Sequence, residues 1–408
     1  MTGRARANGE GSIYPFRNGF AAYAWVTTPE GQRKRKYVYG PDRETVHRKW
    51  IDLHRRAAER PVPTRVPTVA DWLATWLAEE VEPNLAPSTA VNYAMFARLY
   101  VVPVLGSTRL DRLSVQDVQR WLNSLREQCQ CCVQGKDAGR SASKQRCCAL
   151  GECCEDVLSP RSVSDVRAAF RSALASAITR ELISRNPAAL VKLRTPRRRR
   201  RKAWTSEQAR QFLESARAAG DALYAAYVLT LVLGLRRGEV LGLVWDDLDL
   251  DNAELTVGLQ LQRVSGELLH RETKTEGSDA TLPLPGICVA ALRWQKARQE
   301  EARARAGGAW RDELGFVFTT RYGTPIEPRN MLRSFHRLIA AAGVPDRAVH
   351  DARRTCATLL VDLDVHPRVI MQILRHAQIS VTMEIYSQAP SRQTREALRR
   401  LSDSLDRA

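Results

Sequence analysis

The sequence predicts a multidomain, mainly α-helical protein that contains two small β-sheets. The chain has 408 residues, enough for two to four folded units at roughly 100 to 200 residues each. Apolar residues alternate with a period of two near the N-terminus and within residues 253–285, whereas elsewhere they mostly recur with helical spacing. A proline-rich and an arginine-rich segment separate these patterns.

The charge balance indicates a polyanionic partner. Lys and Arg number 63 against 45 Asp and Glu, which gives a formal net charge of +18, so nucleic acid is the leading partner class. The longest apolar stretch, residues 222–235, has 14 residues, short of the roughly 20 that span a bilayer. It predicts a buried core helix, and residues 1–10 lack an apolar signal segment. We therefore expect a cytoplasmic, nucleoid-associated protein without a membrane partner. Only nine of the 63 basic residues are Lys, a bias typical of GC-rich coding sequence, which favours a bacterial host.

Residues 1–62 predict a small unit of three strands and one helix. Turns at residues 17–19 and 29–31 bracket the alternating bulky residues Phe20, Tyr23 and Trp25, which is typical of strands. A third strand is expected at residues 36–39 and a helix at residues 43–60. The unit is basic, so its sheet is interpreted as a DNA reader; the alternative is a small domain with a solvated basic surface.

Residues 66–193 predict a helical unit. The preceding residues 61–67 carry three prolines, which cannot continue a helix. Thr68 and Asp71 have the spacing of a capping box at the start of the first helix. Further helices are expected at residues 88–101, 114–125 and 162–185, because apolar residues recur there with helical spacing.

A cysteine-rich insertion, residues 127–157, interrupts this helical unit. Seven of the nine cysteines lie between Cys129 and Cys154, arranged as CxCC followed by two adjacent pairs. Six or seven thiolates could complete one or even two tetrahedral zinc sites. Adjacent pairs differ from the usual two-residue spacing, so a reduced surface insertion without metal is the alternative. The metal content of the segment therefore stays open at this point.

Residues 194–202 form a basic linker, and residues 203–408 predict an α-rich unit with a small sheet. The linker holds seven cations in nine residues from Arg194 to Lys202 and is expected to lie extended along DNA phosphates; the alternative is a solvated segment. The capping box at Thr205 starts the next helix. Residues 253–285 predict a hairpin or small sheet with Lys274 at the hairpin tip.

Four local patterns in this last unit carry side chains suited to phosphate chemistry. An Arg follows Gly-Leu at the end of the apolar helix, a Lys lies in a polar turn, a His and an Arg three residues apart share a helical face, and a His precedes a Tyr by ten residues. Taken alone, each has an ordinary structural explanation, such as an ion pair between Arg236 and Glu239. The candidate catalytic residues are Arg236, Lys274, His350, Arg353, His376 and Tyr386.

In this order and local context, the six residues resemble the active-site signature of the tyrosine recombinases, the phage integrase family. The resemblance extends to residues 66–193 as the helical core-binding domain and, more weakly, to residues 1–62 as the arm-type DNA-binding domain, which makes residues 203–408 the catalytic recombinase domain. Two departures are Arg354, where many members carry His, and Arg375, where many carry Gly. Neither is a catalytic position.

The resemblance implies DNA integration and excision through a 3′-phosphotyrosine intermediate. Tyr386 would attack the phosphorus, while Arg236 and Arg353 would hold the phosphate and His376 would donate a hydrogen bond. The resemblance assigns proton donation to the leaving oxygen to Lys274, and hydrogen bonding or proton transfer with the nucleophile to His350.

The expected partners follow from the same resemblance. They are double-stranded DNA attachment sites, a homotetramer on that DNA and DNA-bending accessory proteins, with no cofactor required for catalysis. The alternatives are the same chemistry used for chromosome or plasmid dimer resolution or for supercoil relaxation, and a catalytically inactive DNA-binding protein. The basic N-terminal unit favours integration, because dimer resolvases of the family usually lack one.

Overall fold

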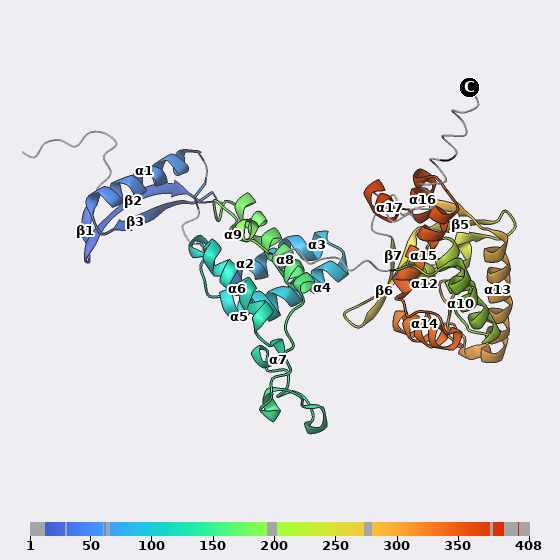
Figure 1. Ribbon diagram of the computed structural model, residues 1–408. Helices are drawn as coiled ribbons and strands as arrows, with labels where there is room; N and C mark the ends of the chain where they lie inside the picture. The colour runs from blue at the N-terminus through green and yellow to red at the C-terminus, as the bar shows by residue number, and fades with distance from the viewer. Residues whose placement is uncertain are drawn as a thin grey trace, which may run out of the picture. The chain divides into compact units, whose positions relative to one another are not determined.

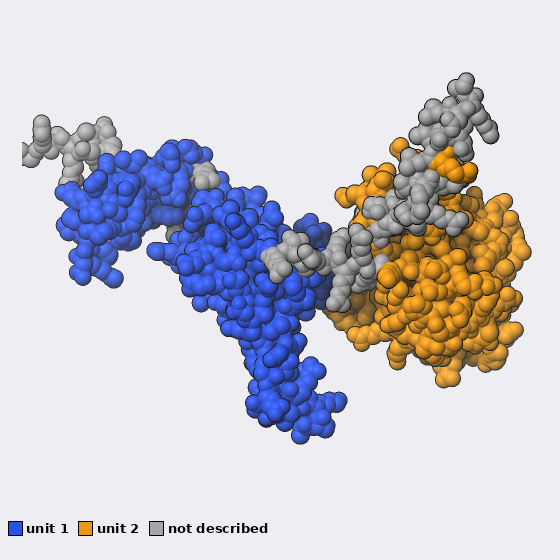
Figure 2. All heavy atoms as spheres, in the orientation of Figure 1, with its two compact units in different colours: residues 1–198 blue, residues 199–408 orange. Residues whose placement is uncertain are grey.

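The chain forms two compact units, residues 1–198 and residues 199–408 (Figure 2). The structure is a computed structural model that describes residues 13–28, 31–59, 61–62, 66–193, 202–272, 280–375, 378–386 and 399. The boundary between the units falls in the predicted linker 194–202, most of which lies outside the described residues. The predicted fold class is confirmed: both units are mainly helical with small sheets (Figure 1). The exact domain limits stay predictions.

The first unit begins with a three-stranded antiparallel sheet in the order β1-β2-β3. The strands are β1 (Tyr14–Phe16), β2 (Gly19–Thr27) and β3 (Arg33–Gly40), and helix α1 (Arg43–Glu59) follows. Small side chains such as Ala22 and Ala24 are buried under α1, since side chains alternate between the two faces of a strand. The Trp50 Nε1 group of α1 donates to the Tyr23 carbonyl oxygen over 3.0 Å.

The rest of the first unit is a helical bundle. It comprises α2 (Val69–Trp76), α3 (Glu82–Asn84), α4 (Pro87–Phe96), α5 (Val102–Leu105), α6 (Val115–Glu127), α7 (Gln130–Val133), α8 (Pro160–Thr179) and α9 (Pro187–Leu190). Single π-helical turns join α2 to α3 and α4 to α5. The capping box predicted at Thr68 and Asp71 is present. The last predicted helix is shorter than expected, because Glu181 adopts a positive φ of 58° just after α8.

Aromatic residues fill the core of this bundle. Trp121 and Phe170 are buried and meet edge to face with ring centroids 5.4 Å apart, a favoured aromatic geometry. The buried indole N–H of Trp72 donates to the Ala173 carbonyl oxygen over 2.8 Å. Each large side chain thus joins helices that are distant in sequence.

In the second unit, other helices pack around one buried apolar helix. Its helices are α10 (Ser206–Ala218), α11 (Tyr224–Val232), α12 (Arg237–Gly242), α13 (Gly286–Ala306), α14 (Pro328–Ala342), α15 (Val349–Asp362), α16 (Pro367–Leu374) and α17 (Ile379–Tyr386). α11 packs against α10, α12, α13 and α15, and seven consecutive residues from Ala225 to Leu231 are buried. The prediction of a buried core helix within residues 222–235 is confirmed. Among the described residues, no helix is long and apolar enough to cross a membrane.

Two small antiparallel sheets interrupt these helices. One has the order β4-β5-β8 and the other pairs β6 with β7, the strands being β4 (Leu248–Asp249), β5 (Glu254–Val257), β6 (Leu259–Val264), β7 (Glu267–Glu272) and β8 (Ala280–Pro283). The expected position of Lys274 at the hairpin tip is wrong, because the β6–β7 hairpin turns at Ser265 and Gly266. Both residues have the positive φ that a tight turn requires. Lys274 falls between β7 and β8, outside the described residues.

Candidate active site

The candidate site starts at the turn between α11 and α12. Gly234 has a φ of +63°, and a Cβ atom there would lie 2.3 Å from the Leu374 Cδ2 atom of α16. Glycine is therefore required both for the left-handed backbone and for the close approach of α16. Arg236 is the residue immediately before α12, so this turn fixes where its side chain leaves the backbone.

Arg236 is held by a buried carboxylate in the first turn of α12. Glu239 is 2% exposed and accepts the Arg236 backbone N–H over 2.8 Å and the Arg236 Nη1 group over 2.5 Å. The Arg236 side chain is nevertheless 40% exposed. The ion pair that was the structural explanation for Arg236 thus exists, and the side chain still remains partly accessible to a further anion.

Arg353 of α15 lies deeper in the protein. Its Nη1 group donates to the Gly234 carbonyl oxygen over 2.7 Å, and its Nη2 group donates to the Leu374 carbonyl oxygen. Burial of the guanidinium, with the nearby Arg236 charge, lowers the pKa of Arg353 to about 9. The side chain therefore connects the α11–α12 turn to the end of α16 and brings a second cation next to Arg236.

Arg375 supplies a third guanidinium, which is buried like that of Arg353. It follows α16 with a φ of 52°, a conformation in which glycine avoids strain. The side chain is 1% exposed, and its Nη2 group lies 2.6 Å from the Glu239 Oε2 atom. Burial lowers the pKa of Arg375 despite the attraction of Glu239.

Glu239 therefore lies between Arg236 and Arg375. Burial alone would raise the pKa of the Glu239 carboxyl, but Arg375 and then the Arg236 backbone and charge outweigh it, so the pKa is lowered. The three guanidinium groups and one carboxylate of this cluster carry two net positive charges. A phosphodiester carries one negative charge and would offset part of this excess.

The other predicted catalytic residues lie on the elements next to this cluster or outside the description. His350 is exposed at the second position of α15, one helical turn before Arg353. Tyr386 is the last residue of α17, whose backbone is described, and α15, α16 and α17 pack against one another. Lys274 and His376 lie outside the described residues. The six catalytic assignments therefore stay predictions.

Sequence reasoning missed the role of Arg375. The resemblance makes Arg375 a departure from the family pattern and leaves it outside the predicted catalytic set. Its side chain nevertheless enters the cluster and shares Glu239 with Arg236. The available signal was a charged residue where the resemblance implies Gly, but the 1% exposure of the side chain and its contact with Glu239 show that it turns inward.

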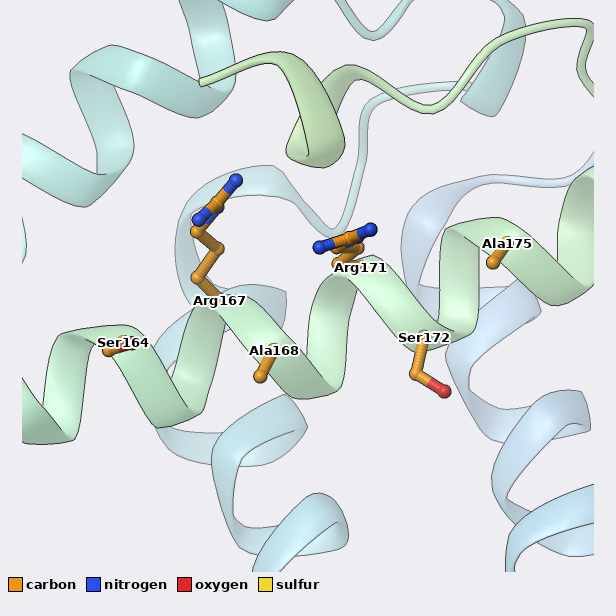
Figure 3. A pocket seen from close by; sticks show the side chains of 6 residues that line it. All are labelled: Ser164, Arg167, Ala168, Arg171, Ser172 and Ala175. Carbon is orange, nitrogen blue, oxygen red and sulfur yellow. The ribbon is translucent and has the colours of Figure 1, made fainter. Parts of the chain in front are cut away.

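Besides the guanidinium cluster, basic side chains also line a groove along α8. Arg167 and Arg171 project from one side of the helix, separated by one turn (Figure 3). The Arg167 side chain donates to the carbonyl oxygens of Ala188 and Ala189, whereas Arg171 is exposed. The residues that line the groove are Ser164, Arg167, Ala168, Arg171, Ser172 and Ala175.

The N-terminal sheet presents a third basic surface, on the face opposite α1. The Arg35 guanidinium lies 4.8 Å from the ring centroids of both Tyr23 and Trp25, which is a cation–π geometry. Trp25, Tyr37 and Tyr39 are 45%, 42% and 50% exposed. Arginine and aromatic side chains exposed together on a sheet are suited to contacts with nucleic acid.

Comparison with known proteins identifies similar sequences for both units. The phage integrase family profile matches residues 202–392, and the phage integrase N-terminal SAM-like domain matches residues 68–126. A tyrosine recombinase XerC-like protein of Caldanaerobacter subterraneus is 32% identical over 195 residues. The alignment covers 45% of this chain and 50% of that protein's length. An integrase of Streptomyces ambofaciens is 28% identical and aligns with 73% of this chain and 70% of its own length.

Solved structures share the fold. The Tn1549 transposon integrase in complex with transposon right end DNA has a TM-score of 0.63 at 20% identity and covers 82% of this chain and 99% of its own. A lambda integrase tetramer bound to a Holliday junction has a TM-score of 0.53 at 16% identity and covers 94% of this chain and 96% of its own. The second likeness includes the region of the N-terminal sheet.

Proposed function

Because the chain belongs to the phage integrase family of tyrosine recombinases, we propose that it is a site-specific DNA recombinase that integrates or excises a phage or other mobile element. The observation that carries the proposal is the guanidinium cluster of Arg236, Arg353 and Arg375 around the single carboxylate of Glu239. All six candidate catalytic residues lie within the part of the chain that matches the family, residues 202–392.

The proposed reaction exchanges one phosphodiester for another. The Tyr386 oxygen forms a bond to the phosphorus, and the bond from the phosphorus to the 5′ oxygen breaks, which leaves a 3′-phosphotyrosine and a 5′ hydroxyl. Arg236 and Arg353 neutralise the non-bridging oxygens, where charge develops in the transition state. Lys274 donates the proton that the 5′ oxygen takes up. A partner strand's 5′ hydroxyl reverses the step.

The histidines complete this assignment. His376 donates a hydrogen bond to the phosphate, and His350 exchanges a proton or hydrogen bond with the tyrosine. An unperturbed tyrosine has a pKa near 10, so cations near Tyr386 would be needed to favour its phenolate. Because the phosphotyrosine link conserves the bond energy, we propose that cleavage and rejoining require neither a nucleotide nor a metal ion.

Two surfaces of the first unit are proposed to bind DNA outside the reacting bond. The exposed Arg171 of α8 would contact phosphates near the cleavage site, while the N-terminal sheet with Arg35 would bind a separate arm-type site. Such a second DNA-binding surface favours integration over dimer resolution. Four protomers would assemble on two sites, assisted by DNA-bending proteins, at the nucleoid of a bacterial cytoplasm.

Covalent trapping tests the proposed chemistry. The full-length protein is incubated with DNA that flanks its own gene, denatured with detergent, and digested so that any peptide linked to nucleotide can be mapped by mass spectrometry. We expect an adduct on Tyr386 that is absent from Tyr386→Phe and retained by Tyr322→Phe, a control at an exposed tyrosine of the same unit. DNA binding without an adduct, or an adduct elsewhere, would contradict the assignment.

A second experiment tests the arm-binding role of the N-terminal sheet. Replacing Arg35 by Gln removes a cation from the exposed face and is expected to weaken binding to the arm-type DNA and to reduce the salt slope by about one. Arg55→Gln is the matched control, because Arg55 lies on α1 and pairs with Asp52. Equal effects of the two substitutions on DNA affinity would refute a specific role for the sheet.

A further inference from the structure

The cysteine-rich segment between α6 and α8 forms a small folded extension of the first unit. Figure 1 shows the chain around α7 projecting from the helical bundle. Its secondary structure consists of α7 and two turns of 3₁₀-helix, residues 142–144 and 148–150. Cys129, Cys131 and Cys147 are its buried apolar cluster. So small a cluster cannot stabilise a fold by apolar burial alone, and segments of this size usually need a disulfide or a metal ion.

Four sulfur atoms in this extension have the spacing of a metal centre. The Sγ atoms of Cys129, Cys132, Cys147 and Cys153 all lie within 4.8 Å of one another. The Cys129–Cys147 distance is 3.8 Å and the Cys132–Cys147 distance is 3.3 Å. A tetrahedral ion with bonds of about 2.3 Å to sulfur sets its ligands about 3.8 Å apart, so the four atoms fit around a single ion.

The arrangement allows one ion in this segment. Cys131 and Cys154 form a second group, but it has only three sulfurs and shares Cys147 with the first. Two separate sites would need two complete ligand sets. Cys148 is exposed and belongs to neither group.

The sequence spacing supports this ligand set. Cys129 and Cys132 are separated by two residues, the spacing of a zinc knuckle. The expectation based on adjacent cysteine pairs did not include this spacing. Because α7 begins directly after Cys129, its helical turn brings the Cys132 sulfur back beside the Cys129 sulfur.

Backbone groups are arranged to stabilise thiolates at the other pair of ligands. The Cys154 N–H donates to the Cys147 sulfur over 3.3 Å, and the Glu155 N–H donates to the Cys153 sulfur over 3.4 Å. Hydrogen bonds of this kind favour the anionic form of the acceptor. The chain between Cys147 and Cys153 reverses at Gly151, whose φ is +75°.

A buried carboxylate holds the loop that carries Cys147. The Asp137 side chain is fully buried and accepts the N–H groups of Arg146, Cys147 and Ala149. It also pairs with Arg140 over 2.7 Å. Asp137 therefore orients the ligand loop from outside the ring of sulfurs, as the groups behind metal ligands commonly do.

We propose that Cys129, Cys132, Cys147 and Cys153 bind one zinc ion as four thiolates, and that this closed site holds the segment between α6 and α8 in its folded form. Four protein ligands leave no position open for a substrate, so the role is structural. Soft thiolate ligands select zinc over magnesium or calcium. The inference is independent of the strand-exchange reaction, since the segment lies in the first unit.

Metal analysis of the full-length protein tests the proposal. The protein is purified under reducing conditions without added zinc. Its zinc content is measured by inductively coupled plasma mass spectrometry and its reduced cysteines by thiol titration. We expect about one zinc per chain, retained by Cys148→Ser and lost from Cys147→Ser. Fewer than roughly one zinc per three chains in fully reduced wild-type protein, or equal loss from both variants, would overturn it.

Two further measurements identify the ligands without relying on activity. Replacing the metal by Co²⁺ in wild-type protein is expected to give the intense absorption of a tetrahedral tetrathiolate, and a spectrum without thiolate charge transfer would overturn the ligand type. Cys153→Ser is expected to lose the ion and Cys154→Ser to keep it. The reverse result would overturn the proposed fourth ligand.

Discussion

Replacing Glu239 by Gln is the most informative perturbation of the guanidinium cluster. The substitution keeps the shape and an acceptor for the Arg236 backbone N–H, but removes the charge shared by Arg236 and Arg375. Arg236 is 40% exposed and can be hydrated, whereas Arg375 is 1% exposed and cannot. We expect the second unit to lose roughly 3 kcal/mol of unfolding free energy, because an uncompensated buried charge remains.

The matched control is Glu207→Gln. Glu207 also pairs with an arginine three residues away, but both side chains are more than 60% exposed, at 68% and 63%, so we expect a loss below about 1 kcal/mol. Hydrogen exchange read on peptides of α11 and α15 reports the second unit separately. A loss of about 3 kcal/mol corresponds to exchange faster by roughly a hundredfold.

A double variant separates the buried charge from other effects. Removing Arg375 together with the Glu239 charge, as E239Q with Arg375→Gly, takes away the buried cation that Glu239 pairs with directly and leaves Arg353 on its backbone acceptors. Glycine is unstrained at the φ of 52°. We expect the double variant to lose at least about 1 kcal/mol less than the sum of the two single variants. Additive losses, or equal losses from E239Q and E207Q, would refute the reasoning.

Three further predictions follow from the described residues. Gly234→Ala should destabilise the second unit by about 1–3 kcal/mol in urea unfolding, since its Cβ would meet Leu374 at 2.3 Å; an unchanged midpoint would contradict the close contact. The pKa of Glu239 is lowered in the folded protein, so its carboxylate stabilises the fold at pH values above 4.5, the ordinary pKa of Glu. This stability is lost as the pH falls through the folded pKa. Urea midpoints should therefore fall more steeply with acid in wild type than in E239Q. Burial raises the pKa of the Cys356 thiol to about 12. Alkylation of native protein at about pH 8 should therefore label the exposed Cys148 and spare Cys356. Peptide mass spectrometry that finds both cysteines labelled equally would contradict the burial.

The sequence by itself determined the fold class and the chemistry to be tested. Helical and strand periodicities reflect which faces are buried, so they located the N-terminal sheet, the bundle helices and the apolar helix α11. The resemblance of six residues, in their order and local context, to the tyrosine recombinase signature identified the catalytic candidates. These residues supply the cations, the proton donor and the nucleophile that phosphate chemistry requires.

Tertiary structure decided which side chains share one environment. Arg236, Arg353 and Arg375 are far apart in sequence and meet only because α11, α15 and α16 pack together. The same holds for the four sulfurs, since Asp137 and the turn at Gly151 bring Cys147 and Cys153 to Cys129. Periodicity describes burial along one element, whereas ion pairs and metal sites depend on distances between elements, and folding alone sets those distances.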